Sequence, residues 1–265
     1  MDKTRVFGPV PSRRLGKSVG INNIPPKICT YSCVYCQLSR SIKMVTDRQE
    51  YYDPEDLLIE TKEKIKNAEL NNEPIDYLTI VPDGEPTLDI NLGRLIDLLK
   101  PLGFKVAIIT NSTLLEIPEV RQDIGKADWV SVKIDTLDEK TWRKINRPHR
   151  KIKFDSMLDG IRSFSREFIG QLVTETMLVK DLNDDTENAR KVAEFIGELK
   201  PSIAYLSIPI RPPAEKWVEV PKEQKINNAY QIFRERSIVT EYLIGYEGNE
   251  FAYTGNIEED ILSIT

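Results

Sequence analysis

Short β-rich runs alternate with helical runs along most of this 265-residue chain. The apolar runs have the length of strands, and the segments between them show the period of amphipathic helices. This alternation is typical of βαβ units, whose strands lie parallel in one sheet. The predicted strands are residues 19–22, 77–81, 105–110, 129–134, 172–178 and 203–208.

The predicted helices are residues 54–68, 92–99, 117–124, 138–145, 154–164, 184–199 and 222–234. Six strands with crossover helices predict an α/β fold, a partial (β/α)6 barrel with short N-terminal and C-terminal extensions. We expect the barrel to occupy residues 1–235. Residues 236–265 are expected to form a C-terminal extension, which is either a lid or a truncated appendage.

The composition indicates the cell compartment of this chain and the kinds of partner it binds. No run approaches the roughly 18 apolar residues of a membrane span, and the first residues lack the apolar stretch of a signal peptide. We therefore expect a cytoplasmic protein with no membrane partner. A dedicated nucleic-acid binder is more often basic. The net charge of −5 thus does not favour nucleic acid as a partner, although it does not exclude it.

The only cysteines of the chain, Cys29, Cys33 and Cys36, lie in one short loop. Three thiolates can hold three irons of a [4Fe–4S] cube and leave the fourth iron open, whereas electron-transfer clusters usually take four cysteines. An open metal position is the mark of a catalytic site. The alternative is a zinc-binding module without catalytic activity, with His149 as the one histidine available. Zinc sites usually use paired knuckles, and the chain has no second one.

The cysteine loop, with Tyr35 just before its last cysteine, resembles the CxxxCxΦC motif of the radical S-adenosylmethionine (SAM) superfamily. The resemblance covers nearly the whole chain and points to a single-cluster branch described loosely as iron–sulfur oxidoreductases. It implies a [4Fe–4S] cluster on the three cysteines, and SAM chelated on the open iron. It also implies reductive cleavage of SAM to a 5′-deoxyadenosyl radical, and an electron donor of the flavodoxin or ferredoxin type. Tyr35 would pack against the adenine or shield the cluster.

The segment 83–87, which follows a predicted strand, is similar to the Gly-Gly-Glu motif that receives the SAM ammonium in this family. Glu85 is the expected acceptor, because an ammonium in a dry pocket needs a carboxylate. Gly84 lets the backbone approach closely. Asp83 replaces the first glycine of the motif and puts its local geometry in doubt. The alternative is an ordinary turn, since Pro-Asp-Gly is strong turn chemistry.

Three further strand ends carry residues that the resemblance assigns to SAM. The segment 110–112 is similar to a Thr-Asn-Gly motif, so Asn111 and Ser112 are expected to bind the ribose or carboxylate of SAM, unless they only cap the next helix. Thr174 and Thr176 share one face of the strand 172–178, with Glu175 on the other. We expect Thr176 to contact SAM.

Ser131, Lys133 and Asp135 alternate with apolar residues, so all three point to one face of their strand. Polar groups inside a barrel are costly unless a ligand or a partner satisfies them. A similar Asp-x-Lys strand reaches SAM in glycyl-radical activating enzymes. We expect these residues to bind SAM or substrate, and the alternative is an internal Lys133–Asp135 pair.

Arginines near two strand ends are candidate substrate ligands. Arg211 lies in a proline-rich loop and is placed to clamp a carboxylate or phosphate. Arg13 and Arg14 precede the first predicted strand and could reach the mouth of the barrel. Six basic residues and no acidic residue lie within residues 143–153, which indicates either a solvated surface or an anionic substrate or partner.

Three functions remain open at the level of sequence. The first is a radical SAM enzyme that abstracts hydrogen from an anionic or nucleotide-like small molecule. The second is an activase that makes a glycyl radical on a partner protein. The third is the zinc-binding module. Because the chain has only three cysteines, it has no second cluster ligated by cysteine.

Overall fold

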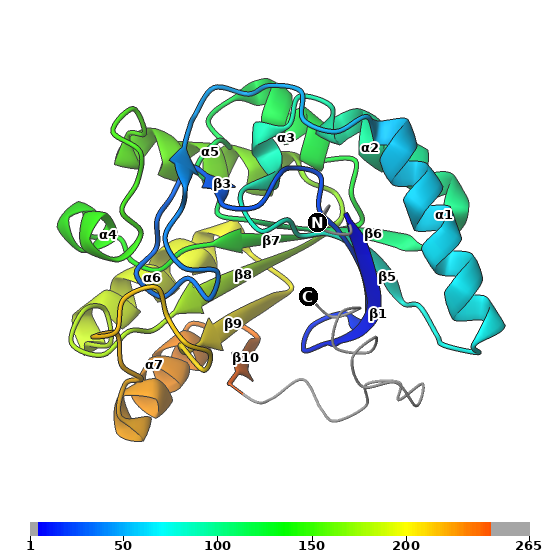
Figure 1. The fold of residues 1–265 in the computed structure, drawn as a ribbon. Helices are drawn as coiled ribbons and strands as arrows, with labels where there is room; N and C mark the ends of the chain where they lie inside the picture. The colour runs from blue at the N-terminus through cyan, green and yellow to red at the C-terminus, as the bar shows by residue number, and fades with distance from the viewer. Residues whose placement is uncertain (1–4, 245–265) are drawn as a thin grey trace.

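The computed structural model describes residues 5–244, which form one curved, mostly parallel sheet covered by helices on its outer face (Figure 1). The strand order in the sheet is β1-β2-β5-β6-β7-β8-β9-β10. Only the β1–β2 pair is antiparallel, and every other neighbouring pair of this sheet is parallel. The strands are β1 Val6–Ser12, β2 Gly16–Ile21, β5 Tyr77–Ile80, β6 Lys105–Thr110, β7 Trp129–Lys133, β8 Gln171–Met177, β9 Ile203–Ser207 and β10 Thr240–Leu243. The short pair β3 Ile28–Cys29 and β4 Lys43–Met44 lies apart.

The helices connect the parallel strands, as the alternation predicts. They are α1 Pro54–Leu70, α2 Leu92–Leu99, α3 Pro118–Ile124, α4 Glu139–Ile145, α5 Phe154–Glu167, α6 Thr186–Leu199 and α7 Glu223–Glu235. Two short 3-10 turns, Pro86–Leu88 and Lys100–Leu102, complete the connections. Local chemistry sets the helix ends: α1 begins with Pro54 in its first turn, and the Asp53 side chain caps it by accepting from the Glu55 amide.

The sheet separates two apolar layers. The larger layer fills the space between the sheet and the helices and includes Val130, Val132 and Leu206. The smaller layer lies on the opposite, inner face and includes Trp129, Val173 and Tyr205. This inner layer closes one end of the barrel interior, here called the lumen. Polar residues of the same strands therefore occupy the part of the lumen nearer the carboxyl ends of the strands.

The structure confirms the α/β partial barrel and all six predicted strands, and it adds two strands that the sequence analysis did not predict. β1 forms an antiparallel hairpin with β2 in place of an irregular N-terminal extension. β10 pairs in parallel with β9, so the sheet continues past residue 235 into the expected C-terminal extension. β10 escaped prediction because it is short and has two exposed central residues. Most of the expected lid or appendage, residues 236–265, lies outside the described residues.

Within residues 5–244, no helix combines the length and the apolar character that crossing a membrane requires.

A buried asparagine ties the carboxyl ends of β7 and β8 to the start of α6. The Asn183 side chain donates to the carbonyls of Asp135 and Met177, both at 2.8 Å, and accepts from the Val179 amide at 2.7 Å. Asn183 is fully buried, so the Met177 carbonyl and the Val179 amide depend on it in a dry environment, while the Asp135 carbonyl also accepts from Asn188 at 3.4 Å. The sequence analysis predicts no ligand role for this residue, and its contacts are with the backbone.

We expect Asn183→Ala to lower the free energy of unfolding by about 3 kcal/mol, because two buried backbone groups lose their side-chain partner and the Asp135 carbonyl keeps only the longer bond from Asn188. Chemical denaturation of the two proteins measures this difference. Asn67→Ala on the exposed face of α1 is the matched control and should change stability by less than about 0.5 kcal/mol. Equal effects of the two substitutions would contradict the structural role of Asn183.

Candidate active site

The cysteine loop is held in place by backbone pairing with the segment that follows α4. The amides of Ser32 and Val34 donate to the carbonyls of Asn146 and Ile145 at 3.1 and 2.8 Å, and the His149 amide donates to the Thr30 carbonyl at 2.9 Å. In Figure 1 this loop, which follows β3, lies against the carboxyl ends of β7 and β8. The structure thus places the three cysteines where the sites of parallel α/β folds are found.

Each of two cysteine sulfurs has an asparagine amide as a neighbour. Asn111 Nδ2 lies 3.4 Å from Cys29 Sγ, and Asn146 Nδ2 lies 3.6 Å from Cys33 Sγ. All three cysteines are free thiols. Burial, followed by the charge of Asp135, raises the pKa of Cys33 to about 12, and burial raises the pKa of Cys29 further still. The thiols are therefore neutral here, and binding iron releases their protons.

The arrangement of the sulfurs fits a cluster better than a single ion. No group of three or more His, Cys, Asp and Glu side chains among residues 5–244 converges closely enough to hold one metal ion. A zinc site needs its ligands at about 2.0–2.3 Å from a common centre. In a [4Fe–4S] cube each cysteine binds a different iron, so the sulfurs need not converge. The three free thiols, two of which have an asparagine amide nearby, are thus suited to bind three different irons of one cluster.

The loop Asp83–Glu85, at the end of β5, lies directly against the residues that precede Cys29. The Glu85 amide donates to the Ile28 carbonyl at 3.1 Å, and the Lys27 amide donates to the Asp83 carbonyl at 2.5 Å. A Cβ at Gly84 would lie 2.1 Å from the Ile28 carbonyl oxygen, which is backbone and cannot move aside. Only glycine permits this contact, so Gly84 sets the distance between the two loops.

Glu85 is a buried carboxylate that joins β5 to β6. One of its oxygens accepts from the hydroxyls of Thr87 and Thr110, both at 2.6 Å, and the other accepts from the Asn111 amide at 2.8 Å. Burial raises the pKa of Glu85, because all these donors are neutral. Glu85 and Asn111 thus lie together beside Cys29, as the two motifs predict.

Asp135 connects three segments around the cysteine loop. It accepts from the Tyr35 hydroxyl, from Asn146 Nδ2 at 2.7 Å and from the Met177 amide at 2.8 Å. Tyr35 and Asp135 are both buried. In this structure the Tyr35 hydroxyl therefore anchors the loop to the end of β7. Its predicted packing against adenine remains a prediction.

The lumen contains a network of charges that the sequence analysis only partly predicts. Lys133 Nζ lies 3.0 Å from a Glu175 oxygen and 3.7 Å from an Asp135 oxygen, and it sits over the Tyr35 ring at 5.0 Å from the centroid. Arg14, from the β1–β2 turn, pairs with the other oxygen of Glu175. Burial opposes ionisation of Glu175, but Lys133 and Arg14 outweigh it and lower its pKa well below the usual range.

The structure reverses the predicted faces of β8. Parallel pairing in register puts Glu175 beside Lys133, and Thr174 beside Val132 in the layer that faces the helices. Thr176 is buried, and its hydroxyl donates to the Ile134 carbonyl at 2.8 Å, while its contact with SAM stays a prediction. One signal could have identified Glu175. It is the only charged residue of a strand that must be buried, and Lys133 is its natural partner on the preceding strand.

Two predicted SAM ligands, Ser112 and Ser131, lie within the packed protein, and their role toward SAM stays a prediction. Ser112 is fully buried with a positive φ of 72°, and its hydroxyl accepts from the Lys133 amide at 2.9 Å. Ser131 lies on the same face as Lys133, between Ile109 and Val173 of the neighbouring strands, and is almost fully buried. Ser112 thus shapes the end of β6, and Ser131 lies beneath the lumen network.

A second group of charges joins the proline-rich loop to the cysteine loop. Glu215 accepts from Arg40 in a two-pronged contact at 2.8 and 3.0 Å and also pairs with Arg147. These hydrogen bonds lower the pKa of Glu215 to about 2. Arg211 of the same loop donates to Gln37 at 2.9 Å, and Arg13 donates to the Leu243 carbonyl at 2.8 Å. Of the three predicted arginines, Arg211 thus lies beside the cysteine loop, Arg13 reaches the end of β10 and Arg14 lies in the lumen. The sequence analysis missed Glu215.

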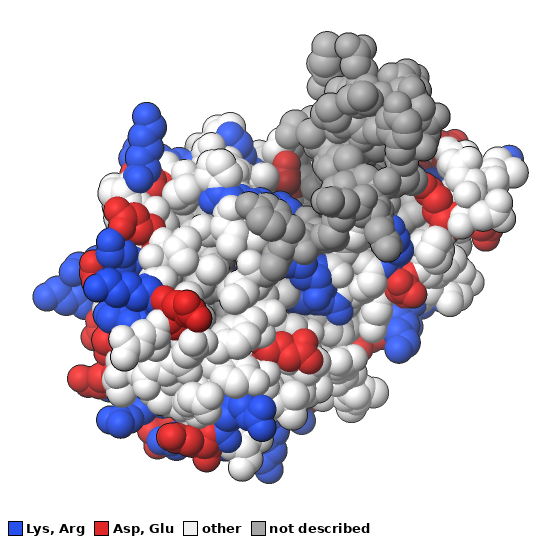
Figure 2. Space-filling model, turned by 90° about the horizontal axis from the view of Figure 1, so that it is seen from below, with Lys and Arg blue, Asp and Glu red and all other residues white. Residues whose placement is uncertain are grey.

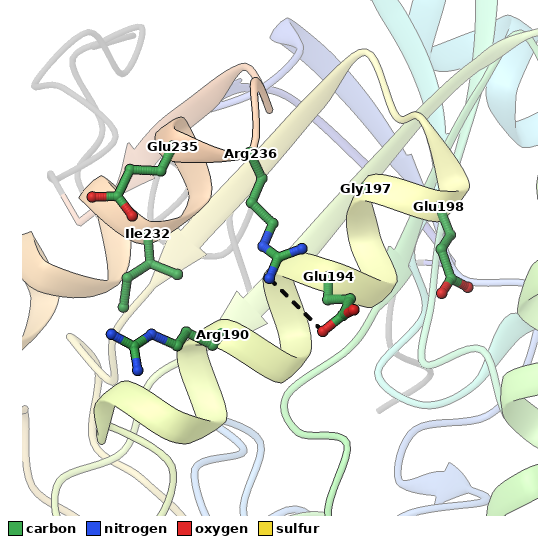
Figure 3. A pocket seen from close by; sticks show the side chains of 7 residues that line it. All are labelled: Arg190, Glu194, Gly197, Glu198, Ile232, Glu235 and Arg236. Carbon is green, nitrogen blue, oxygen red and sulfur yellow. Dashed lines mark ion pairs between the residues drawn. The ribbon is translucent and has the colours of Figure 1, made fainter.

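The outer surface offers a different kind of cavity. A groove of about 720 Å³ between α6 and α7 is lined by charged side chains, with Arg236 and Glu194 forming an ion pair at 3.8 Å (Figure 3). It lies on the helix layer, outside the sheet. The face seen from below mixes acidic and basic side chains around an uncharged central area (Figure 2). No residue that lines the groove belongs to the cysteine loop.

Comparison with known proteins agrees with this geometry. A family model described as "Radical SAM superfamily" matches residues 23–193. The "UPF0026 protein MJ1312" of Methanocaldococcus jannaschii is 50% identical over 99% of this chain and 82% of that protein. An "S-adenosylmethionine-dependent nucleotide dehydratase" of Lacinutrix mariniflava is 28% identical over 70% of this chain and 38% of that protein.

The fold has a match among solved structures. The crystal structure of Streptococcus suis SuiB bound to S-adenosylmethionine has a TM-score of 0.61 and 15% identity, and the match covers 84% of this chain and 49% of that one. At this identity the match shows a common fold. With its cysteine loop, its parallel partial barrel and its relatives, this chain belongs to the radical SAM superfamily of enzymes, which use a [4Fe–4S] cluster and S-adenosylmethionine.

Proposed function

We propose that this enzyme cleaves SAM reductively and abstracts hydrogen from an anionic, nucleotide-like substrate bound in the lumen. The cluster, when bound to Cys29, Cys33 and Cys36, supplies the electron that releases a 5′-deoxyadenosyl radical from SAM. The residues of the chain bind the two molecules, orient them and exclude water. The free thiols that this chemistry needs suit a reducing cytoplasm.

The observation that carries the proposal is the position of the lumen charges. Lys133 and Arg14 flank Glu175 on the inner face of the sheet, and Lys133 also contacts the ring of Tyr35 from the cysteine loop. Lys133 also lies 3.7 Å from Asp135, so the two cations face two carboxylates, and an anionic group of the substrate would compete with these carboxylates for the cations. A phosphate or carboxylate that enters from the open end would find both cations already desolvated, which strengthens their attraction.

Glu85 and Asn111 are the proposed ligands for SAM. Glu85 Oε2 accepts one bond, from the Asn111 amide, and so keeps a lone pair for an ammonium. The Asn111 side chain contacts Cys29 and Thr30, which supports a role for it beside SAM at the cluster loop. Gly84 keeps this pair close to the cysteine loop.

The relative named as a nucleotide dehydratase supports a nucleotide-like substrate, because its likeness extends over most of this chain. The two buried cations of the lumen, Lys133 and Arg14, support an anionic group in the substrate from independent evidence. No observation among the described residues favours the glycyl-radical activase or the zinc-binding module.

We expect Cys33→Ala to lose the cluster and SAM cleavage together, because a cluster held by two thiolates is not retained. After anaerobic reconstitution, iron and sulfide content measure the first effect, and 5′-deoxyadenosine formed with dithionite measures the second. Ile42→Ala, an exposed side chain just after the loop, should keep both. Full SAM cleavage by Cys33→Ala would refute the assignment.

We expect Lys133→Met to weaken the binding of a nucleoside triphosphate about tenfold, equivalent to roughly 1.4 kcal/mol, while cluster content stays unchanged. Calorimetric titration with GTP and CTP, with SAM present, measures the affinity. The matched control is Lys180→Met, which removes an exposed lysine paired with Glu219 and should leave binding unchanged. Cleavage of SAM by a wild-type enzyme that binds no triphosphate would refute the substrate class and leave SAM cleavage standing.

We expect Glu175→Gln to lower the free energy of unfolding by about 3–5 kcal/mol at pH 7, because Arg14 loses its buried counter-ion and Lys133 keeps only Asp135, at 3.7 Å. The folded-state pKa of Glu175 is lowered, so its stabilisation is present above the unfolded pKa of about 4.3 and is lost as the pH falls below it. Denaturation at several pH values should therefore show the gap between wild type and variant narrowing below about pH 4.

Glu219→Gln at the exposed pair with Lys180 is the control for this substitution and should cost less than about 1 kcal/mol. A gap for Glu175→Gln that stays constant from pH 7 to pH 3 would contradict the ionic origin of the effect.

A further inference from the structure

The segment Arg143–Lys153, here called the basic segment, contrasts with the rest of an acidic protein. It carries six lysines and arginines and no acidic residue, while the whole chain has a net charge of −5. Three of its cations have partners: Arg143 pairs with Glu139, Arg147 with Glu215, and Lys151 with Asp47.

The other three cations of the basic segment are Lys144, Arg150 and Lys153. All three are exposed, and no ion pair within residues 5–244 involves them. Lys144 lies in the last turn of α4, and Lys153 lies just before the first turn of α5. The segment therefore presents uncompensated positive charge to the solvent, in a form that attracts an acidic surface.

The basic segment is also the part of the chain that holds the cysteine loop. The carbonyls of Ile145 and Asn146 accept from the loop amides of Val34 and Ser32, and Asn146 Nδ2 lies 3.6 Å from Cys33 Sγ. Arg147 follows Asn146 directly and is half-buried. A molecule docked on this surface would thus lie little more than one residue away from Cys33, an expected ligand of the cluster.

The position of the basic segment distinguishes between two kinds of anionic partner, a substrate and an electron donor. A substrate, whether a nucleotide or an RNA, must reach the lumen, where Lys133 and Glu175 lie. The α4–α5 connection runs outside the cysteine loop (Figure 1), away from the lumen. An electron donor needs only a short distance to the cluster, because the rate of electron transfer falls steeply with distance. The geometry therefore favours an electron donor over RNA.

We propose that the basic segment is the docking surface for an acidic one-electron donor protein. One electron leaves the reduced flavin or iron–sulfur centre of the donor and enters the bound cluster, so the donor is oxidised by one electron and no atom is transferred. This inference rests on the proposed function, because it assumes a cluster that must be reduced.

The test reverses the three unpaired charges in the variant Lys144→Glu, Arg150→Glu and Lys153→Glu. Reduction of the reconstituted cluster by a reduced acidic flavodoxin is followed by stopped-flow absorbance at low and at high salt. We expect the low-salt rate to fall about 10- to 100-fold, and its dependence on salt to disappear, because electrostatic steering is lost. Reduction by dithionite, a small molecule that needs no docking, should keep its rate.

The matched control reverses Lys62, Lys64 and Lys66 on α1, on the other side of the molecule from α4 (Figure 1). It makes the same change in net charge and should reduce the flavodoxin rate less than twofold. Equal losses in the two variants, or no loss in the first, would overturn the proposal.

Binding of oxidised flavodoxin to the protein before reconstitution gives a second readout that does not need the cluster. We expect the first variant to weaken this binding and the control variant to retain it. Unchanged flavodoxin binding, combined with loss of binding to a single-stranded RNA probe, would overturn the proposal in favour of RNA. If dithionite and SAM give no 5′-deoxyadenosine in the wild type, the proposed function fails, while the binding readout still decides the docking surface.

Discussion

The buried carboxylate of Asp135 is the interaction on which the arrangement of the site depends. It accepts from Tyr35 of the cysteine loop, from Asn146 after α4 and from the backbone of β8 at Met177. A charge taken out of water must find several donors, and here each donor comes from a different segment. The same asparagine that satisfies Asp135 also contacts Cys33. Loop position and the surroundings of the sulfur are therefore set by one network.

Two other buried carboxylates, Glu85 and Glu175, have pKa values that their surroundings shift in opposite directions. Glu85 accepts only from neutral donors, so burial dominates and raises its pKa. Glu175 lies between Lys133 and Arg14, whose charges outweigh burial and lower its pKa. Glu85 can accept a further cation at little cost, whereas Glu175 is already neutralised and holds two cations in the lumen. This division suits a site that binds an ammonium near the cluster and an anion further inside.

The charged groups of the lumen form a buried set, and those of the basic segment form an exposed set. The lumen network is buried and desolvated, so it acts at short range on a bound molecule. The basic segment is exposed and screened by salt, so it acts on the encounter with a partner. Asn146 and Arg147, which are adjacent in sequence, connect the buried charges to the exposed ones. Asn146 contacts Cys33, and Arg147 pairs with Glu215 near the surface.

The sequence by itself determined the fold class, the six central strands and the identity of the cysteine loop. These follow from periodicity and from spacing along the chain, which are local properties. The sequence also singled out Glu85 and Asn111 at strand ends, and only the structure shows that the Asn111 amide donates to Glu85. Register and long-range pairing were decided only by the tertiary structure. The inward face of β8, the contact of Glu175 with Lys133 and Arg14, and the parallel addition of β10 each depend on a neighbour distant in sequence. A shift of one residue along a strand exchanges its two faces, so a pattern in which Thr174, Glu175 and Thr176 are all polar cannot select between them.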